Sequence, residues 1–334
     1  MIEAMCRKSV GTMLSLVFTA TILAVSPAAI AQSRVENDPV IEMLRQGRIL
    51  EAEKLARNGI ARNPKSAQAL FAMGRVSMSK KSDEAVEWFE KAVAADQRNS
   101  LYHFWLGQAY GRQAQRASKF RQPFLAKKVQ AEFEKARDLD PSSIDPRVGL
   151  VEFYLLAPGF MGGGEDKALA EVSEIRKRDA LMGHLMMGRV YRKQKRLDLV
   201  EKEYLSARKA YPNREEPYLW LGSHYEGSKQ FQKAFDVYEG QLRDQPDNMS
   251  ALYQIGKVAS VSGQNLDRGL EAMTKYLRHT PKEGSPPLAN AHYRLGGIYE
   301  KKGNRDEARK AYREALRLNP ELKDAREALA KLGA

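Results

Sequence analysis

The sequence predicts an all-α fold, an α-solenoid of about eight helix-turn-helix repeats followed by a C-terminal capping helix. Two observations lead to this prediction. Residue patterns recur along the chain with a period of 34 residues. Within each period, apolar residues fall on the faces of two successive helices. Self-similarity of this kind indicates a repeat architecture, for which the usual estimate of domain number from chain length does not apply.

The composition is that of a soluble, well-packed protein. The chain has 334 residues, of which 43% are hydrophobic and 29% charged, and its formal net charge is +13. These values exclude a disordered chain. A net positive charge of this size favours solubility and acidic partners.

Residues 1–31 have the three regions of a secretory signal peptide. Arg7 and Lys8 precede an apolar run at 10–25, and the small residues Ala29 and Ala31 then supply a cleavage site. The alternative is an uncleaved anchor, for which the apolar run is short. We therefore expect export to the periplasm or beyond, with a mature chain that begins at Gln32.

The only cysteine, Cys6, precedes the apolar run, where the lipid-modified cysteine of a bacterial lipoprotein cannot be. Cleavage would therefore leave a mature chain without a disulfide or a thiolate metal site.

The clearest repeats follow one another in the second half of the chain. One unit carries Met187, Gly188, Tyr191, Tyr204, Ala207 and Pro212. The next carries Leu221, Gly222, Tyr225, Ala234, Tyr238 and Pro246. The two glycines are 34 residues apart, and so are the two prolines.

The remaining units match the same frame less regularly. Upstream, the first two units are marked by Ala52, Ala56, Pro64, Met73, Gly74, Ala85, Phe89 and Ala92. Two interrupted units follow, marked by Leu106, Gly107, Tyr110, Phe133, Ala136, Pro141, Gly149 and Ala168. The last two units carry Ile255, Gly256, Gly269, Met273, Pro281, Leu295, Gly296, Tyr299, Ala308, Tyr312, Ala315 and Pro320.

Each element of the period has a physical reason. Apolar residues at positions 4, 7 and 11 share one face of a first helix, and those at 20, 24 and 27 share one face of a second. The small residue at position 8 allows the second helix to approach closely, and the proline at position 32 stops that helix. After Pro320, apolar residues recur at helical spacing among charges as far as Leu332, which predicts the capping helix at 321–334.

This pattern resembles the tetratricopeptide repeat family. The resemblance covers nearly all of the expected mature chain and implies a right-handed superhelix of stacked helix pairs. We assign the solenoid to 37–320 and place insertions at 111–128 and 156–166, where two units are interrupted.

The resemblance also implies a concave groove, lined by positions 2, 5, 6, 9, 12 and 13 of each first helix. These positions correspond to Phe71, Arg75, Phe104, Trp105, Leu185, Arg189, Arg192, Leu219, Trp220, Tyr253, Lys257, Tyr293 and Arg294. Aromatic and cationic side chains are common anchors of interfaces, so we expect a protein or peptide partner of acidic character. We also expect about half of the rings to pack between repeats. No unit has the Lys and Asn pair of the carboxylate-clamp subfamily.

The insertion at 111–128 is basic and contains no acid. It carries Arg112, Arg116, Lys119, Arg121, Lys127 and Lys128, with Phe120 and Phe124 among them. One interpretation is an elongated, solvated hairpin. The other is a patch for anionic lipid, an anionic envelope polymer or an acidic protein. Nucleic acid is not expected for an exported chain.

The insertion at 156–166 reads LAPGFMGGGED and poses the question of a phosphate-binding loop. Such a loop needs a preceding strand and Gly-Lys followed by Ser or Thr. Here a helical segment precedes the glycines, and Gly164 is followed by Glu165. We therefore predict a turn in which Pro158 ends one helix, glycines adopt positive φ, and an acid begins the next helix.

No chemistry-bearing motif is found. The histidines at 103, 184, 224, 279 and 292 are dispersed, and no ligand cluster has the spacing that zinc needs. No catalytic signature is present, so we expect no enzyme activity, no metal and no cofactor. The prediction is a non-catalytic interaction scaffold of the bacterial cell envelope. The alternative is a docking module for an anionic envelope polymer or lipid surface through the basic insertion.

Overall fold

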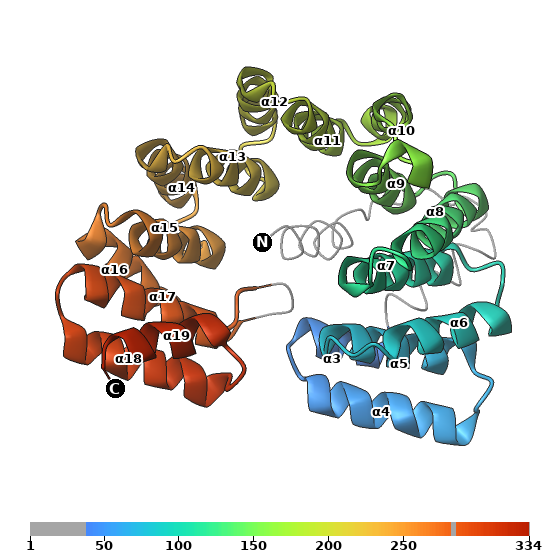
Figure 1. Cartoon of the computed structure of the whole chain (residues 1–334), viewed down its shortest axis with the longest axis horizontal. Helices are drawn as coiled ribbons and strands as arrows, with labels where there is room; N and C mark the ends of the chain where they lie inside the picture. The colour runs from blue at the N-terminus through green and yellow to red at the C-terminus, as the bar shows by residue number, and fades with distance from the viewer. Residues whose placement is uncertain (1–37, 282–284, 334) are drawn as a thin grey trace. The chain divides into compact units, whose positions relative to one another are not determined.

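The computed structural model describes residues 38–281 and 285–333, and all regular structure in these ranges is helical. The expected signal peptide at 1–31 lies outside the described residues. The chain divides into two compact units, Met1–Leu197 and Asp198–Ala334. The predicted all-α fold is therefore confirmed over the described chain (Figure 1).

The helices have the following bounds. The first unit contains α3 (Pro39–Arg45), α4 (Ile49–Arg62), α5 (Ala67–Ser79), α6 (Ala85–Ala95), α7 (Ser100–Arg116), α8 (Gln122–Leu139), α9 (Asp145–Leu156), the short 3-10 helix η1 (Gly159–Met161), α10 (Glu165–Arg178) and α11 (Ala180–Lys193). The second unit contains α12 (Leu197–Ala210), α13 (Glu216–Gly227), α14 (Phe231–Asp244), α15 (Met249–Ser262), α16 (Leu266–Tyr276), α17 (Leu288–Lys301), α18 (Arg305–Leu318) and α19 (Lys323–Lys331), α12 beginning one residue before the boundary.

Short polar side chains begin many of these helices. Each stands at the N-cap and accepts a hydrogen bond from a backbone N–H of the first turn, which has no partner within the helix. The residues that do so are Asp38, Ser66, Asn99, Asp179, Asn248 and Asn304.

Within the first unit, each helix from α3 to α11 packs against the next along the chain. The first helices of neighbouring pairs also touch, as α7 does with α9 and α9 does with α11. Figure 1 shows the pairs α7–α8 and α9–α10 side by side. This stacking buries the apolar faces that a single pair would leave open.

The second unit repeats the arrangement. Each helix from α13 to α18 packs against the next, and the first helices α15 and α17 are also in contact. The terminal helix α19 packs on α18 and buries Ala325, while Leu322, Leu329 and Leu332 are half-buried. The predicted capping helix thus forms at 323–331.

Close contact between the two helices of a repeat depends on the glycine at position 8. A Cβ atom at Gly222 would overlap the ring of Tyr238, and one at Gly296 would overlap the ring of Tyr312. Both rings are almost completely buried. The same overlap recurs between Gly74 and Phe89, Gly107 and Phe133, and Gly256 and Met273. The small residue predicted at this position therefore admits a large one from the facing helix.

The turn between the two helices contains a residue in the left-handed region, seven positions after the glycine at position 8. Gly263 and Gly303 occupy this place with φ of 77° and 79°. In three other repeats the residue is lysine, with φ between 57° and 62°, namely Lys81, Lys195 and Lys229. A side chain beyond glycine is strained in this conformation.

The basic insertion at 111–128 is largely helical. It extends α7 to Arg116 and begins α8 at Gln122, so that only a short turn at 117–121 separates the two. Leu125, Ala126 and Val129 of α8 are buried, which anchors the extension. The result is an elongated helical hairpin.

The glycine-rich insertion forms the predicted turn. The helix α9 ends before Pro158, and Glu165 and Asp166 stand in the first turn of α10. Gly162 has a positive φ of 97°, and a Cβ at Gly163 would overlap the carbonyl oxygen of Ala157. The backbone geometry of this turn thus requires glycine at positions 162 and 163.

Over the described residues, no helix is long and apolar enough to cross a membrane.

Candidate functional site

In the first unit, an aromatic and a cationic side chain from neighbouring repeats stack on each other. The guanidinium carbon of Arg75, on α5, lies 3.8 Å from the ring centroid of Trp105, on α7. The Trp105 ring also neighbours the buried ring of Phe89 at 6.2 Å. Both Arg75 and Trp105 are half-buried, so part of each remains accessible. A cation over an indole face is among the stronger cation–π arrangements.

Farther along the same unit, a bidentate ion pair joins α9 to α11. Arg189 donates from Nε and Nη2 to the two carboxylate oxygens of Glu152, at 2.7 and 2.5 Å. Both side chains are only about one sixth exposed, 15% for Arg189 and 16% for Glu152. Because the guanidinium group is planar and donates both hydrogen bonds in parallel, it fixes the orientation of both side chains. The positive charge of Arg189 is therefore already matched.

The second unit has a comparable ion pair between α13 and α15. The Nζ atom of Lys257 lies 2.7 Å from a carboxylate oxygen of Glu226. The buried Tyr238 also donates its hydroxyl hydrogen to Glu226, at 2.9 Å. Burial and the neighbouring carboxylate raise the pKa of Tyr238 well above its usual value. The tyrosine therefore remains a neutral donor, and Glu226 is held from two sides.

On α17 in the second unit, Tyr293 and Arg294 are half-buried, and the guanidinium of Arg294 lies 5.0 Å from the Tyr293 ring centroid. The ring of Tyr293 also packs at 5.9 Å from that of Tyr312. An exposed edge thus remains beside a cation, as it does at Trp105 in the first unit.

The groove residues named from the sequence divide into two sets. Four of the aromatic rings are buried, and they contact other rings within their own unit rather than a surface: Phe71, Phe104, Trp220 and Tyr253. The half-buried residues are Arg75, Trp105, Arg189, Arg192, Lys257, Tyr293 and Arg294. The leucines at 185 and 219 are buried as well. Only the half-buried set offers atoms to a partner without repacking of the helices.

Glu152 and Glu226, which match two of the cations, were not among the residues selected from the sequence. Glu226 stands four residues after Gly222, at position 12 of its repeat, which is one of the groove positions of the family. The repeat frame alone would therefore have identified it. Glu152 stands three residues after Gly149, at position 11, where the frame predicts a core residue.

The six cations of the basic insertion also divide into two sets, those with a partner in the described chain and those without an ion pair in it. Arg116 pairs with Asp83, Lys128 with Glu90, and Arg112 donates to the carbonyl oxygen of Met78. The other three cations, Lys119, Arg121 and Lys127, are exposed and have no ion pair within the described chain. The insertion therefore presents a smaller set of free charges than its sequence suggests.

The histidines show structural contacts. His103 is buried, with Nδ1 at 2.6 Å from a carboxylate oxygen of Glu132 and Nε2 at 3.1 Å from the carbonyl oxygen of Gln97. His224 is buried against the rings of Tyr204 and Tyr225. In the described ranges, no group of three or more His, Cys, Asp or Glu side chains is placed to hold a metal ion.

A hollow of about 410 Å³ lies over one helix of the second unit. It is lined by Asp198, Glu201, Lys202, Leu205, Ser206 and Lys209 of α12. The Tyr225 hydroxyl, which donates to Glu201 at 2.7 Å, lowers the pKa of that carboxyl. A lowered pKa suits an ion-pairing carboxylate and not a general base near neutral pH.

Comparison with known proteins gives one consistent result. Two family models described as tetratricopeptide repeat match residues 41–100 and 289–322. No curated protein matches the sequence.

Among solved structures, yeast Tom70 has a TM-score of 0.66 at 14% identity, over 86% of this chain. This chain spans 58% of the length of that Tom70 chain. A tetratricopeptide repeat protein from Parabacteroides merdae has a TM-score of 0.48 at 13% identity, over 80% of this chain and 99% of that one. TTC0263 of Thermus thermophilus, also such a protein, has a TM-score of 0.48 at 18% identity, over 58% of this chain and 97% of that one.

Sequence identities this low support a comparison of folds but not of functions. The matched repeats, the helix pairs and the glycine contacts at position 8 nevertheless agree with one another, and the predicted α-solenoid of tetratricopeptide repeats is confirmed. The chain thus contains tetratricopeptide repeats, which the family models match at residues 41–100 and 289–322.

Proposed function

We propose that this chain is a non-catalytic scaffold of the bacterial cell envelope, and that it binds a protein or peptide partner on the surface of the first helices of its repeats. Tetratricopeptide repeat proteins are generally scaffolds for protein interactions. The stacked pair of Arg75 and Trp105 carries the proposal for this chain, because it joins two repeats and keeps a large ring accessible. Rigid aromatic anchors lose little entropy on binding.

The pairing of charges refines the kind of partner. Arg189 and Lys257 already face carboxylates of this chain, so an acidic partner would have to displace Glu152 or Glu226. Removing one member of such a half-buried pair is costly. We therefore propose that the partner contributes an apolar side chain against Trp105, in place of the acidic character expected from the sequence.

The envelope location rests on residues 1–31. The basic start, the apolar run and the small residues before Gln32 support export. Sequencing the N-terminus of the protein purified from the cells that produce it tests this part. A chain that begins at Gln32 agrees with the proposal, and a chain that retains residues 1–31 overturns cleavage.

The binding surface is tested by crosslinking in intact cells, followed by identification of captured proteins. The test variant combines Arg75→Ala with Trp105→Ala. The control combines Trp88→Ala with Lys91→Ala, because Lys91 likewise lies over the ring of Trp88, at 4.7 Å, but on the second helix α6. We expect the test variant to lose its partner and the control to keep it.

Ionic strength provides a second criterion. Binding through a ring should persist as salt rises, since the Debye length falls from about 10 Å at 0.1 M to about 3 Å at 1 M and weakens only charge contacts. Capture that disappears with salt, or that survives in the Arg75→Ala and Trp105→Ala variant, contradicts the proposed surface.

A further inference from the structure

The glycine-rich insertion packs against the helix that the basic insertion begins, although the two insertions belong to different repeats. The 3-10 helix η1, in the glycine-rich insertion, packs against α8, whose residues 122–128 belong to the basic insertion. At Gly162 the backbone approaches Gln130 of α8 so closely that a Cβ would overlap its side-chain oxygen. Lys167 donates to the carbonyl oxygen of Gly162 at 3.0 Å. The two insertions are therefore neighbours on α8, at one end of the first unit, which we call the tip and define as residues 117–128 and 156–167.

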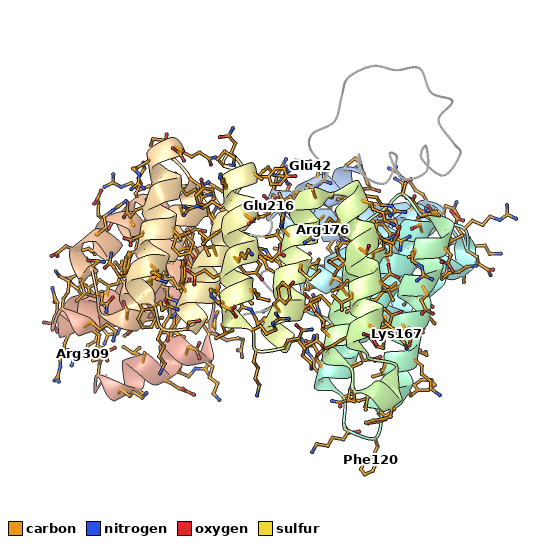
Figure 2. All side chains as sticks on the ribbon, turned by 90° about the horizontal axis from the view of Figure 1, so that it is seen from above. Glu42, Phe120, Lys167, Arg176, Glu216 and Arg309 are labelled. Carbon is orange, nitrogen blue, oxygen red and sulfur yellow. The ribbon has the colours of Figure 1, made fainter. Side chains whose placement is uncertain are left out.

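The tip carries every exposed aromatic side chain of the described residues. These are Phe120, Phe160 and Phe124, with exposed fractions of 96%, 80% and 64%. Leu156, which is 60% exposed, lies in the same segment. Figure 2 shows Phe120 extending beyond the ribbon at the end of the hairpin, with Lys167 toward the same end of α10 and Arg176 farther from it. Exposed rings of this size on two adjoining segments indicate an interaction surface.

Free positive charges lie close in sequence to two of these rings, Phe120 and Phe124. Lys119 and Arg121 flank Phe120 in the sequence, and Lys127 follows Phe124 by three residues, within one turn of α8. None of these three cations has an ion pair in the part of the chain that is described. The tip has two acids, Glu165 and Asp166, at the start of α10. Its net charge remains positive.

We propose that the tip docks on the surface of an anionic lipid bilayer. The rings of Phe120, Phe124 and Phe160 enter the interface between headgroups and acyl chains, and Lys119, Arg121 and Lys127 contact the anionic headgroups. This proposal is independent of the partner surface at Arg75 and Trp105.

The chemistry of the tip favours a bilayer over a soluble partner. Phe120 is almost fully exposed and extends beyond the ribbon, so the described residues bury almost none of its ring (Figure 2). A bilayer needs no shape complementarity, because it accommodates separate rings at the depth that each reaches. Lysine and arginine near such rings extend their charged ends to the headgroups while their apolar stems remain below. An acidic soluble polymer would use the cations and leave the rings in water.

The test measures the partition of the full-length chain onto phosphatidylcholine vesicles with and without about 30% phosphatidylglycerol. Each lysine or arginine near an anionic surface contributes about fivefold to partition. We therefore expect the variant Lys119→Gln, Arg121→Gln, Lys127→Gln to lose about 100-fold on the anionic vesicles. The control is Lys54→Gln, Arg62→Gln, Lys65→Gln, which removes the same charge from exposed sites on α4 and the turn that follows. It should change partition much less.

The rings are tested separately. We expect the variant Phe120→Ser, Phe124→Ser, Phe160→Ser to bind at least tenfold more weakly, and the emission of a Phe120→Trp variant to shift to the blue when anionic vesicles are added. The apolar residues 10–25 are present in every variant, so differences among the variants report on the tip. Circular dichroism confirms that each variant is folded.

Three results overturn the proposal. In one, the triple glutamine variant binds as well as its control. In another, the Phe120→Trp spectrum does not change with anionic vesicles. In the third, the chain binds a soluble polyanion such as dextran sulfate as tightly as it binds the anionic vesicles, and the triple serine variant binds the polyanion equally well. That result indicates that the tip binds a polymer or an acidic protein.

Discussion

The ring of Tyr238 occupies the space that a Cβ atom at Gly222 would fill, and this contact sets the separation of α13 and α14. Gly222→Ala should therefore force the helices apart and lower the free energy of unfolding by about 2–3 kcal/mol, as overpacking in a core does. Urea unfolding followed by circular dichroism measures this loss. Gly240→Ala is the matched control, because a Cβ at this half-buried site on α14 would meet only the end of the Arg243 side chain, and it should stabilise the helix by up to about 1 kcal/mol. Equal effects at both sites would show that the contact is not limiting.

Lys229 offers a stabilising change in the turn of the same repeat. Its φ of 57° lies in the left-handed region, where Gly303 has a φ of 79° in a later repeat. Lys229→Gly should raise the free energy of unfolding by about 0.5–1 kcal/mol, because it removes backbone strain. Gly303→Ala should have the opposite effect, since the space around Gly303 is open and only the backbone responds. A loss of stability in Lys229→Gly would contradict this explanation.

Gln241 stands on α14 at the place in the repeat that Ala207 and Ala315 occupy in others. It is 1% exposed, and neither its side-chain nitrogen nor its side-chain oxygen has a hydrogen-bond partner in the described structure. Gln241→Met keeps the volume and removes the unsatisfied amide, so it should raise the free energy of unfolding by about 1–2 kcal/mol. Gln232→Met, exposed on the same helix, should change it little. A destabilised Gln241→Met variant would imply that the amide is satisfied in solution.

Tyr154 makes stability depend on pH in the alkaline range. Burial, together with the carboxylate of Glu134, raises the pKa of its hydroxyl from 10.0 to about 12. Between these values the unfolded chain releases the proton and the folded chain retains it, so the stabilising contribution is complete below pH 10 and is lost as the pH rises through 12. Urea unfolding at both ends of this interval should show a smaller loss for Tyr154→Phe than for the wild type. Equal losses of stability in the variant and the wild type would refute the raised pKa of Tyr154.

The fold could be predicted because its main contacts depend on residues at fixed spacing. Gly222 and Tyr238 are 16 residues apart, as are Gly296 and Tyr312, and a small residue facing a large one at that spacing is visible in the sequence. The glycine-rich turn was also predictable, since a phosphate loop requires residues that it lacks.

The candidate site was less predictable, because exposure at a groove position is decided by the neighbouring helices. Phe71 occupies position 5, as Tyr293 does, yet it stacks at 4.8 Å on Tyr102 and is buried, while Tyr293 remains accessible. The pairing of groove cations with carboxylates of the chain itself could not be predicted for a similar reason. Glu152 reaches Arg189 from a different helix, 37 residues away in the sequence.

The proposed partner surface is tested most directly by a photoreactive benzophenone amino acid in place of Trp105, with the same amino acid in place of Trp88 as the control. Both tryptophans are half-buried and lie beside a cation, but they stand on the first and second helices of their repeats. Irradiation of intact cells should yield a discrete adduct from position 105 and none from position 88. Adducts from position 88 alone, or from neither position, would contradict binding on the first helices.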